Sequence, residues 1–388
     1  GFLWGQRRRA LRSPLHSPRA LAQLDERIEA HADGLTVLGD DLGGFVEPAL
    51  EGEDEAAVFA AAFALLRRGD AAALARVRDR FASADGPPLA AVAEALRHGN
   101  AAPLHRDLLA AAERADGRGA LALEVLAFRG VAAPPPDRLA YLAGDDLPTV
   151  RASAWRAAGH AGVALPPARY EAALGDDDPT VRSAALEAAL WARHPGLLAL
   201  CRGLAERPTK DRLDGIVTYA AVAGAEEMPW LGPVLRDRAC GPARLRVAGA
   251  FGHPAFIEPL LALMSNGDPA TAAAAGAAFE KITGESVESD TRATVPPEGA
   301  APDAFEAEFL DEVTLPDPAK AREAWAAMAP RLAGATRICR GHDMARGLDR
   351  EAFAALDMES RWELCARARL AGQWQGTAAA TEAFPIRP

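Results

Sequence analysis

Hydrophobic positions recur every three or four residues along much of this chain, which is the spacing of one face of an α-helix. The clearest early example follows Ser17-Pro18, where serine is a favoured N-cap and proline suits the first helical position. An apolar stripe then runs from Leu21 to Leu38. His31 falls within this stripe, so we expect a hydrogen-bonded core histidine in preference to a metal ligand.

Two consecutive stretches, residues 133–163 and 164–194, are copies of one unit. They align without a gap and are identical at 15 of 31 positions, including the core Gly-Asp-Asp-x-Pro-Thr-Val-Arg. Predicted starts of second helices recur along the chain, every 31 residues at Gly86-Pro87, Gly117, Pro148 and Pro179, and at a looser spacing at Thr209, Gly241 and Pro269. Tandem helix pairs with a fixed period indicate an all-α solenoid, which we expect over residues 54–284.

The second copy shows how one unit is expected to fold. Gly175 should end the first helix, because glycine tolerates the left-handed conformation that often follows a helix. Asp178 should cap the second helix, with Pro179 at its first position. Val181 and Ala185 begin the inward face of that helix.

An arginine follows the buried valine at the same place in both copies, beside a turn of aspartates. We predict that these groups form a structural ladder between neighbouring repeats, with anion binding as the alternative. The predicted ladder consists of Asp145, Asp146, Arg151, Asp176, Asp177 and Arg182.

The repeats are flanked by segments of different character. Residues 1–53 are predicted to form a helical N-terminal cap, and residues 318–388 a C-terminal helical segment that ends in a tail. Residues 285–317 are acidic, contain prolines and are poor in large apolar groups. We therefore interpret them as a loop or linker, and expect residues 285–305 to be mobile relative to the repeats.

Charge and composition exclude several classes of function. The formal net charge of −11 argues against a general nucleic-acid-binding protein, which needs a basic face to displace counterions. The short run Arg7-Arg8-Arg9 is interpreted as a solvent-exposed helix face. No apolar run approaches the ~20 residues of a transmembrane helix, so no membrane insertion is expected. The four cysteines lack CxxC spacing, and reduced thiols in a cytoplasmic protein are expected.

Motifs of catalysis, metal binding and cofactor binding are missing from the sequence. It contains no GxSxG, P-loop, HExxH or EF-hand pattern. The eight histidines are dispersed, and none is followed directly by glutamate. We therefore predict no catalytic residues, no metal ligands and no cofactor, and expect a protein that is not an enzyme.

The repeated core Asp-Asp-x-Pro-x-Val-Arg-x-x-Ala, at 145–154 and 176–185, resembles the HEAT-like repeats first described in phycobilin lyases. The resemblance implies a HEAT-like α-solenoid with a period of about 31 residues. It says little about function, because bilin lyases and HEAT-like DNA glycosylases share the architecture. The acidic charge disfavours a glycosylase.

A second resemblance involves both ends of the chain. Its motifs are Phe2-Leu3-Trp4, Arg7-Arg8-Arg9-Ala10-Leu11, Leu24-Asp25-Glu26-Arg27, and Leu315-Pro316-Asp317-Pro318 followed by Trp325. They are similar to an uncharacterised proteobacterial HEAT-like family whose genes lie in or near type VI secretion clusters. This similarity implies an accessory role in secretion.

These features lead to one functional hypothesis and two alternatives. The hypothesis is a cytoplasmic, non-enzymatic adaptor or scaffold that binds a protein partner, such as a secretion component, an effector or a toxin. One alternative is an immunity protein that binds a cognate toxin. The other is an enzyme of the bilin-lyase type that acts on a small molecule held in the groove.

The predicted partner surface follows from the HEAT-like resemblance, because the second helices of such stacks line the concave side. It consists of Arg156, His160, Ser183, Glu187 and Trp191. Trp191 is the strongest candidate anchor, since accessible tryptophans are frequent hot spots of binding. The alternative is that Trp191 is buried against the following repeat.

Overall fold

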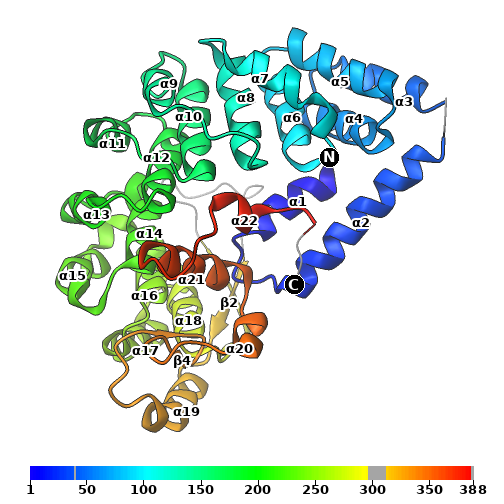
Figure 1. Cartoon of the computed structure of the whole chain (residues 1–388). Coiled ribbons are helices and arrows are strands. Elements are labelled where there is room, and N and C mark those ends of the chain that lie inside the picture. The colour runs from blue at the N-terminus through cyan, green and yellow to red at the C-terminus, as the bar shows by residue number, and fades with distance from the viewer. Residues whose placement is uncertain (39–40, 296–311, 386–388) are drawn as a thin grey trace, which may run out of the picture. The chain divides into compact units, whose positions relative to one another are not determined.

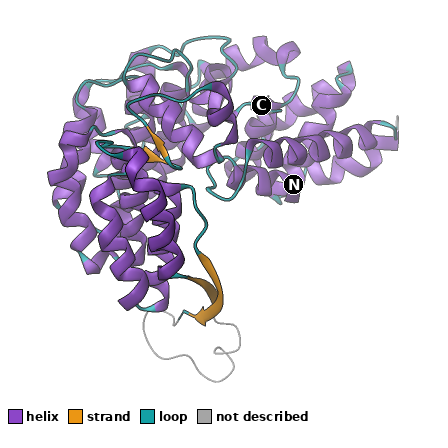
Figure 2. Ribbon diagram, turned by 90° about the horizontal axis from the view of Figure 1, so that it is seen from below, coloured by secondary structure: helices purple, strands orange, loops and turns teal. Residues whose placement is uncertain are grey.

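The computed structural model describes residues 1–38, 41–295 and 312–385. In this part of the chain there are 22 α-helices and two small two-stranded sheets, so the protein is all-α (Figures 1 and 2). None of the described helices is both long and apolar enough to span a membrane.

The chain forms two compact units, which are described separately. Unit 1 is Gly1–Leu197 with Asp357–Pro388, and unit 2 is Leu198–Leu356. The predicted divisions 54–284 and 318–388 therefore each contribute residues to both units.

Unit 1 contains the N-terminal helices, the first helix pairs and the C-terminal helices. Its helices are α1 (Phe2–Ala10), α2 (Pro18–Thr36), α3 (Leu42–Leu50), α4 (Glu55–Arg68), α5 (Ala71–Ser83), α6 (Gly86–His98), α7 (His105–Ala112), α8 (Gly117–Phe128), α9 (Pro136–Leu142), α10 (Pro148–Ala161), α11 (Pro167–Leu174), α12 (Pro179–Trp191), α21 (Met358–Leu370) and α22 (Ala378–Glu382). A short 3-10 helix, Ala102–Leu104, precedes α7.

The helix starts predicted from local signals are confirmed for the second helices of unit 1. Helices α6, α8, α10 and α12 begin at the four predicted positions. Ser17 caps α2 by accepting a hydrogen bond from the Ala20 backbone N–H at 3.2 Å. Asp178 caps α12 by accepting one from the Thr180 backbone N–H at 2.7 Å. Gly175 follows α11 with φ −93°, so the expected left-handed conformation is not adopted there.

Neighbouring second helices pack against one another in chain order, α4 on α6, α6 on α8, α8 on α10 and α10 on α12. Each first helix packs on the second helix that follows it, as α7 does on α8 and α11 on α12. Alanines at the contacts allow this close approach; Ala157, Ala158, Ala185 and Ala188 are fully buried.

Helix α2 is buried along a different stripe from the predicted one. Its buried side chains are Leu21, Asp25, Ile28 and Ala32. His31 is exposed, and its Nδ1 lies 2.7 Å from the carbonyl oxygen of Arg27 one turn earlier. The prediction of a core histidine is therefore wrong, because a buried aspartate occupies the stripe that α2 turns inward.

Unit 2 contains helices and all four described strands. Its helices are α13 (Leu197–Glu206, which begins at the last residue of unit 1), α14 (Leu213–Val222), α15 (Met228–Arg236), α16 (Leu245–Phe251), α17 (Ile257–Asn266), α18 (Pro269–Thr283), α19 (Pro318–Met328) and α20 (Arg350–Ala355). Its strands are β1 (Glu288–Thr294), β2 (Glu312–Pro316), β3 (Ile338–Cys339) and β4 (His342–Asp343). Short 3-10 helices lie at Lys210–Arg212, Ala225–Glu227, Arg238–Cys240, Pro242–Arg244, Pro254–Phe256 and Ala329–Leu332.

The segment 285–317, interpreted from its sequence as a loop or linker, contains strands in its described part. Strand β1 pairs with β2 in antiparallel register, and β2 packs on α18 (Figure 2). A Cβ atom on Gly276 of α18 would lie 2.9 Å from the Cβ of Pro316, so glycine permits this close approach. Residues 296–311 of the predicted linker lie outside the described residues.

Candidate functional site

The second helices of unit 1 share one face that meets the two ends of the chain. Here the terminal segments are residues 1–16 and 357–385; α21 packs on α12 and α22 packs on α10 (Figure 1). We use the name inner face for the side chains of the second helices on this side: Phe59, Phe63, Glu94, Arg97, His98, Glu124, Arg156, His160, Glu187 and Trp191.

Aromatic rings hold both terminal segments to helix α4. Trp4 of α1 stacks on Phe59 with ring centroids 4.6 Å apart. Phe384 meets Trp4 edge-on at 5.3 Å and Phe63 at 5.7 Å. The indole N–H of Trp4 also donates a hydrogen bond to Glu94 at 2.7 Å. The described end of the chain, predicted to be part of a tail, is thus packed in an aromatic cluster.

Arg7 is fully buried beneath this cluster. Its Nε donates to the carboxylate of Asp25 at 2.8 Å, and the Asp25 side chain is only 1% exposed. Its Nη2 donates to the carbonyl oxygen of Ala383 at 2.6 Å. The expectation that residues 7–9 form an exposed basic face is therefore wrong for Arg7, whereas Arg8 is exposed.

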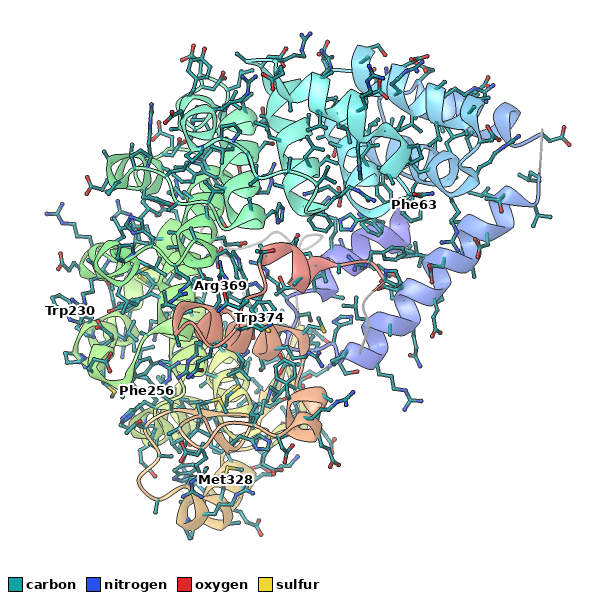
Figure 3. All side chains as sticks on the ribbon, in the orientation of Figure 1. Phe63, Trp230, Phe256, Met328, Arg369 and Trp374 are labelled. Atoms are coloured by element: carbon teal, nitrogen blue, oxygen red, sulfur yellow. The ribbon has the colours of Figure 1, made fainter. Side chains whose placement is uncertain are left out.

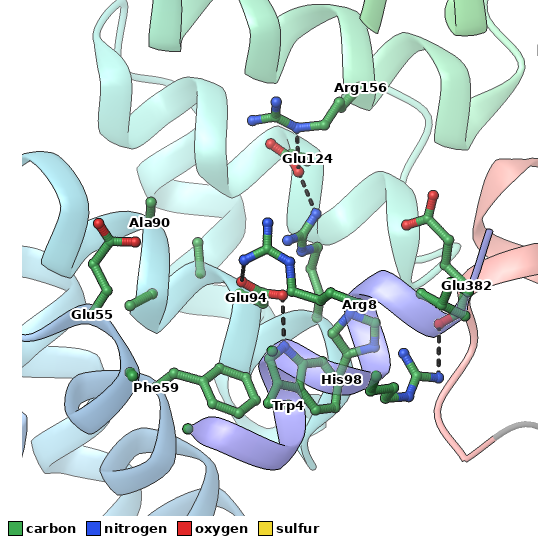
Figure 4. Close-up of a pocket in the computed structure, with 18 of the residues that line it drawn as sticks. Trp4, Arg8, Glu55, Phe59, Ala90, Glu94, His98, Glu124, Arg156 and Glu382 are labelled. Atoms are coloured by element: carbon green, nitrogen blue, oxygen red, sulfur yellow. Dashed lines mark hydrogen bonds and ion pairs between the residues drawn. The ribbon is translucent and has the colours of Figure 1, made fainter. Parts of the chain in front are cut away.

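Glu124 of α8 is the most buried carboxylate of the inner face, at 2% exposure. Its Oε1 accepts hydrogen bonds from Arg97 of α6 and from Nε of Arg156 of α10, the latter at 3.0 Å (Figure 4). Burial raises the pKa of Glu124, but the two guanidiniums outweigh it and lower the pKa to about 2. The carboxylate is therefore ionised at neutral pH, while its Oε2 has no hydrogen-bond partner among the described residues.

A cavity of about 530 Å³ opens beside Glu124, a volume within the usual range of small-molecule sites (Figure 4). Its walls come from α1, α4, α6, α8, α10, α21 and α22. The charged groups of the lining include Arg8, Arg12, Glu94, Arg97, Glu124, Arg156 and Glu382. Trp4, Phe59, Leu121 and Trp362 form much of the apolar part.

A second ion pair joins α12 to both terminal segments. Arg12 donates to both carboxylate oxygens of Glu187, at 2.5 and 2.8 Å, and lies 3.7 Å from Glu382. Its guanidinium also lies over the ring of Trp362, 4.3 Å from the centroid. Burial raises the pKa of Glu187, but the Arg12 charge and hydrogen bonds outweigh it and lower the pKa.

Two histidines of the inner face lie beside Phe128. The rings of His98 and His160 meet it edge-on, with centroids 4.7 and 5.1 Å away. Burial, reinforced by neighbouring Arg97, lowers the pKa of His98 well below its usual value. Burial also lowers the pKa of His160. Both imidazoles are therefore neutral at neutral pH.

The five residues predicted to bind a partner occupy different environments. Ser183 is exposed, Arg156 pairs with Glu124, and Glu187 pairs with the N-terminal segment. His160 is only 5% exposed. Their role in binding a partner stays a prediction, since most of them contact the chain's own residues in this structure.

Trp191 is fully buried, which contradicts the expectation of an accessible anchor. Its ring lies 6.1 Å from Trp362 and 5.9 Å from Trp374, centroid to centroid. Its carbonyl oxygen accepts a hydrogen bond from Nε of Arg369 at 2.9 Å. Figure 3 shows Arg369 and Trp374 on the C-terminal segment that covers α12. The C-terminal segment therefore packs directly against Trp191.

Arg151 of the predicted ladder bridges two turns. It donates to both carboxylate oxygens of Asp176 in the next copy, at 2.7 and 2.8 Å. It also donates to the carbonyl oxygens of Asp145 and Asp146 in its own turn, at 2.8 and 3.0 Å.

Arg182 makes the same contacts with its own turn one copy later. It donates to the carbonyl oxygens of Asp176 and Asp177 at 2.7 and 2.9 Å. Arg151 and Arg182, which occupy equivalent positions in the two copies, therefore each bind backbone oxygens of the turn that precedes their own helix.

Of the charged groups that line the cavity, sequence reasoning singled out Arg156 as a binding residue, but not Glu124 or Arg97. One signal was present: Glu124 is the only charged residue in the otherwise apolar run Ala120–Phe128. A charge there must face a partner or leave the core, because a lone buried carboxylate is costly. In the described part of the chain, no cluster of three or more histidines, cysteines or acids is arranged to hold a metal ion.

Comparisons with known proteins add little to this geometry. No protein-family model matches the chain, and no curated protein matches it significantly. Five solved chains do match. One is the crystal structure of an engineered protein from the Northeast Structural Genomics Consortium, at 14% identity over 73% of this chain and 91% of that one, with a TM-score of 0.30. So low a score supports no inference about fold or function.

Proposed function

We propose that the protein is a non-enzymatic scaffold or adaptor, built as a HEAT-like α-solenoid, that binds a protein partner. The observation that carries the proposal is the pair of 31-residue copies, which are identical at 15 positions, including the turn and the start of the second helix, and differ at the others. The ordered packing of second helices from α4 to α12 supports the solenoid. A stack of this kind offers a long surface on which each repeat meets a different part of a partner.

The partner is proposed to be a component or an effector of type VI secretion. The similarity of both ends of the chain to a HEAT-like family encoded near such clusters supports this assignment. An adaptor of this kind acts in the cytoplasm, where effectors are loaded. A toxin as the partner would instead indicate an immunity protein.

The proposed contact surface lies on the side of the first helices, because the terminal segments cover the inner face. Large apolar side chains are exposed there: Leu109 of α7 is 45% exposed and Tyr141 of α9 is 64% exposed. Leu147, in the turn after α9, is 60% exposed. Aromatic and aliphatic side chains left in water are frequent anchors of protein interfaces.

Affinity purification from the native host, followed by mass spectrometry, tests the proposal. The wild type should retain a secretion component or effector, and the double variant Tyr141→Ala, Leu147→Ala should lose it. Val37→Ala is the matched control, because Val37 is 85% exposed on another part of unit 1 and should retain the partner. Equal recovery by all three proteins would refute the proposed surface, and recovery of no specific protein would refute the scaffold role.

A further inference from the structure

The Glu124 site is incomplete with respect to hydrogen bonds. Two arginines share one oxygen of the carboxylate, while Oε2 is buried without a partner among the described residues. Nε of Arg97 is also buried without a described partner. Leaving a buried polar atom unpaired is costly, and more so for a charged group, so such atoms normally form hydrogen bonds with a ligand or with water.

The group formed by Arg97, Glu124 and Arg156 is also unequal in charge. Two guanidiniums against one carboxylate leave a local excess of one positive charge. Glu94 does not act on this pair of arginines directly, because it accepts a hydrogen bond from Trp4 and pairs with Arg8 at 3.4 Å. Glu187 and Glu382 offset part of the charge of Arg156 without a hydrogen bond to it. Glu382 lies 3.7 Å from the guanidinium of Arg12.

The shape and lining of the cavity limit what can enter it. About 530 Å³ accommodates a small molecule but no protein segment of appreciable length. The guanidinium fork matches the oxygens of phosphates and carboxylates. A hydroxyl group is the complement of Oε2, since an ionised carboxylate can only accept hydrogen bonds.

We propose that this cavity binds a small, hydroxyl-bearing oxyanion, a phosphate ester or a hydroxycarboxylate. The oxyanion lies between the guanidiniums of Arg97 and Arg156, and a hydroxyl donates to Oε2 of Glu124. The rings of Trp4 and Phe59 bound the apolar side of the ligand. The site is independent of the proposed scaffold role, because the ligand is held within unit 1 and not on the first-helix surface.

Calorimetry and thermal unfolding of the full chain test the site. The probes are D-glucose 6-phosphate, citrate and sulfate, with D-glucose and sodium chloride at matched ionic strength as controls. Both hydroxyl-bearing anions, or one of them, should bind and raise Tm, sulfate, which has no hydroxyl at neutral pH, should bind more weakly, and glucose and chloride should have no effect. Comparison of the first two probes shows whether a phosphate or a carboxylate is preferred.

Three variants assign the contacts. Arg156→Gln should weaken binding of the preferred anion by about tenfold or more, the effect of losing a hydrogen bond to a charged group. Glu124→Gln should weaken binding of the hydroxyl-bearing anion to a similar degree while leaving binding of sulfate no weaker. Arg202→Gln is the matched control, because Arg202 has the same 39% side-chain exposure and also pairs with a glutamate that is 2% exposed, but in unit 2.

The proposal has two clear ways to fail. One is that no charged probe binds or raises Tm beyond the salt control. The other is that Arg156→Gln and Glu124→Gln bind the probes as tightly as Arg202→Gln does. If Arg156→Gln does not fold, Arg156→Lys is the substitute, because lysine keeps the positive charge but lacks the paired N–H groups of the guanidinium. The same loss of anion affinity is expected for Arg156→Lys. Retention of partner proteins by these variants separates this result from a failure of the scaffold proposal.

Discussion

Glu124 in unit 1 and Glu227 in unit 2 are both 2% exposed and both paired with an arginine whose side chain is 39% exposed. Glu227 has both oxygens occupied, because Arg202 donates to each of them and the Tyr219 hydroxyl donates to Oε2. Glu124 has one oxygen occupied twice and the other bare. The two carboxylates are therefore equally buried but differ in their hydrogen bonds. Both oxygens of Glu227 have a partner, whereas Oε2 of Glu124 has none among the described residues.

The same contrast extends to the rest of the two units. The buried polar side-chain atoms that lack a hydrogen-bond partner, among the described residues, all belong to unit 1. Those of Arg97, His98, Glu124 and Trp362 line or adjoin the cavity. Unsatisfied polar groups gathered around one cavity point to binding, whereas a closed network such as that of Glu227 stabilises the fold.

The largest expected effect concerns the packing of the C-terminal segment, residues 357–385, on the inner face. Trp191→Ala should destabilise unit 1 by about 4 kcal/mol, because it removes a fully buried ring that packs on Trp362 and Trp374. Limited proteolysis should then cut the C-terminal segment earlier than in the wild type. A variant with unchanged unfolding would mean that this segment leaves the inner face in solution. Trp230→Ala, at a tryptophan 39% exposed in unit 2, is the control and should cost much less.

Isosteric replacement of the two glutamates should separate the two sites. Glu227→Gln should lower the free energy of unfolding by about 4 kcal/mol. Both carboxylate oxygens accept hydrogen bonds, so the amide NH₂ of glutamine, itself a donor, would face another donor in either orientation. Glu124→Gln should cost about 2 kcal/mol, since the amide can occupy the position of the bare Oε2. Chemical denaturation followed by circular dichroism measures both. Equal losses would abolish the distinction between the two sites.

Acid should reveal the charge on Glu124. Its pKa in the folded protein is lowered from 4.5 to about 2, so the stability that its ionised form contributes is present above about pH 4.5. This contribution is lost as the pH falls from 4.5 towards 2. The Glu124→Gln variant should therefore lose less stability than the wild type over that interval, as measured by denaturation at a series of pH values. Parallel pH profiles would contradict the assignment.

The smallest effect should come from removing one hydrogen bond to Glu227, so that its site resembles that of Glu124. Tyr219→Phe removes the hydroxyl that donates to Glu227 and keeps the ring and Arg202. We expect a loss of about 1 kcal/mol in unfolding free energy. Binding of the anionic probes in unit 1 should not change. A loss of 3 kcal/mol or more would show that the tyrosine, and not the arginine, holds the carboxylate.

Local signals in the sequence predicted the helices well. Proline at the first helical position and a capping side chain before it act within a few residues, so the starts of α10 and α12 follow from the sequence around them. The same local reading failed for Arg7, whose partner Asp25 lies 18 residues away on another helix. A charged run is normally solvated, and nothing near residue 7 indicates that it is buried.

The candidate site could not be predicted in the same way. Its charged groups come from the region of α1 and from α4, α6, α8, α10 and α22, that is, from both ends of the chain and from the helices between them. Glu124 in its apolar helix was the single local hint. Which arginines approach that carboxylate depends on the order in which the helices stack, and the cover of the cavity depends on where both ends of the chain pack.

The sequence by itself determined that the chain is helical, where the second helices of unit 1 begin, and that two of its units are copies, because capping and hydrophobic periodicity act over one or two helical turns. The predicted starts at Thr209 and Gly241 precede short 3-10 helices, and the α-helices there begin at Leu213 and Leu245. Only the tertiary structure decided that the inner face is covered by the terminal segments, that Trp191 is buried, and that Glu124 lacks a partner on one oxygen. Those properties depend on contacts between residues as far apart as Trp4 and Phe384. Such contacts are fixed by packing and by the burial of charge across the whole unit.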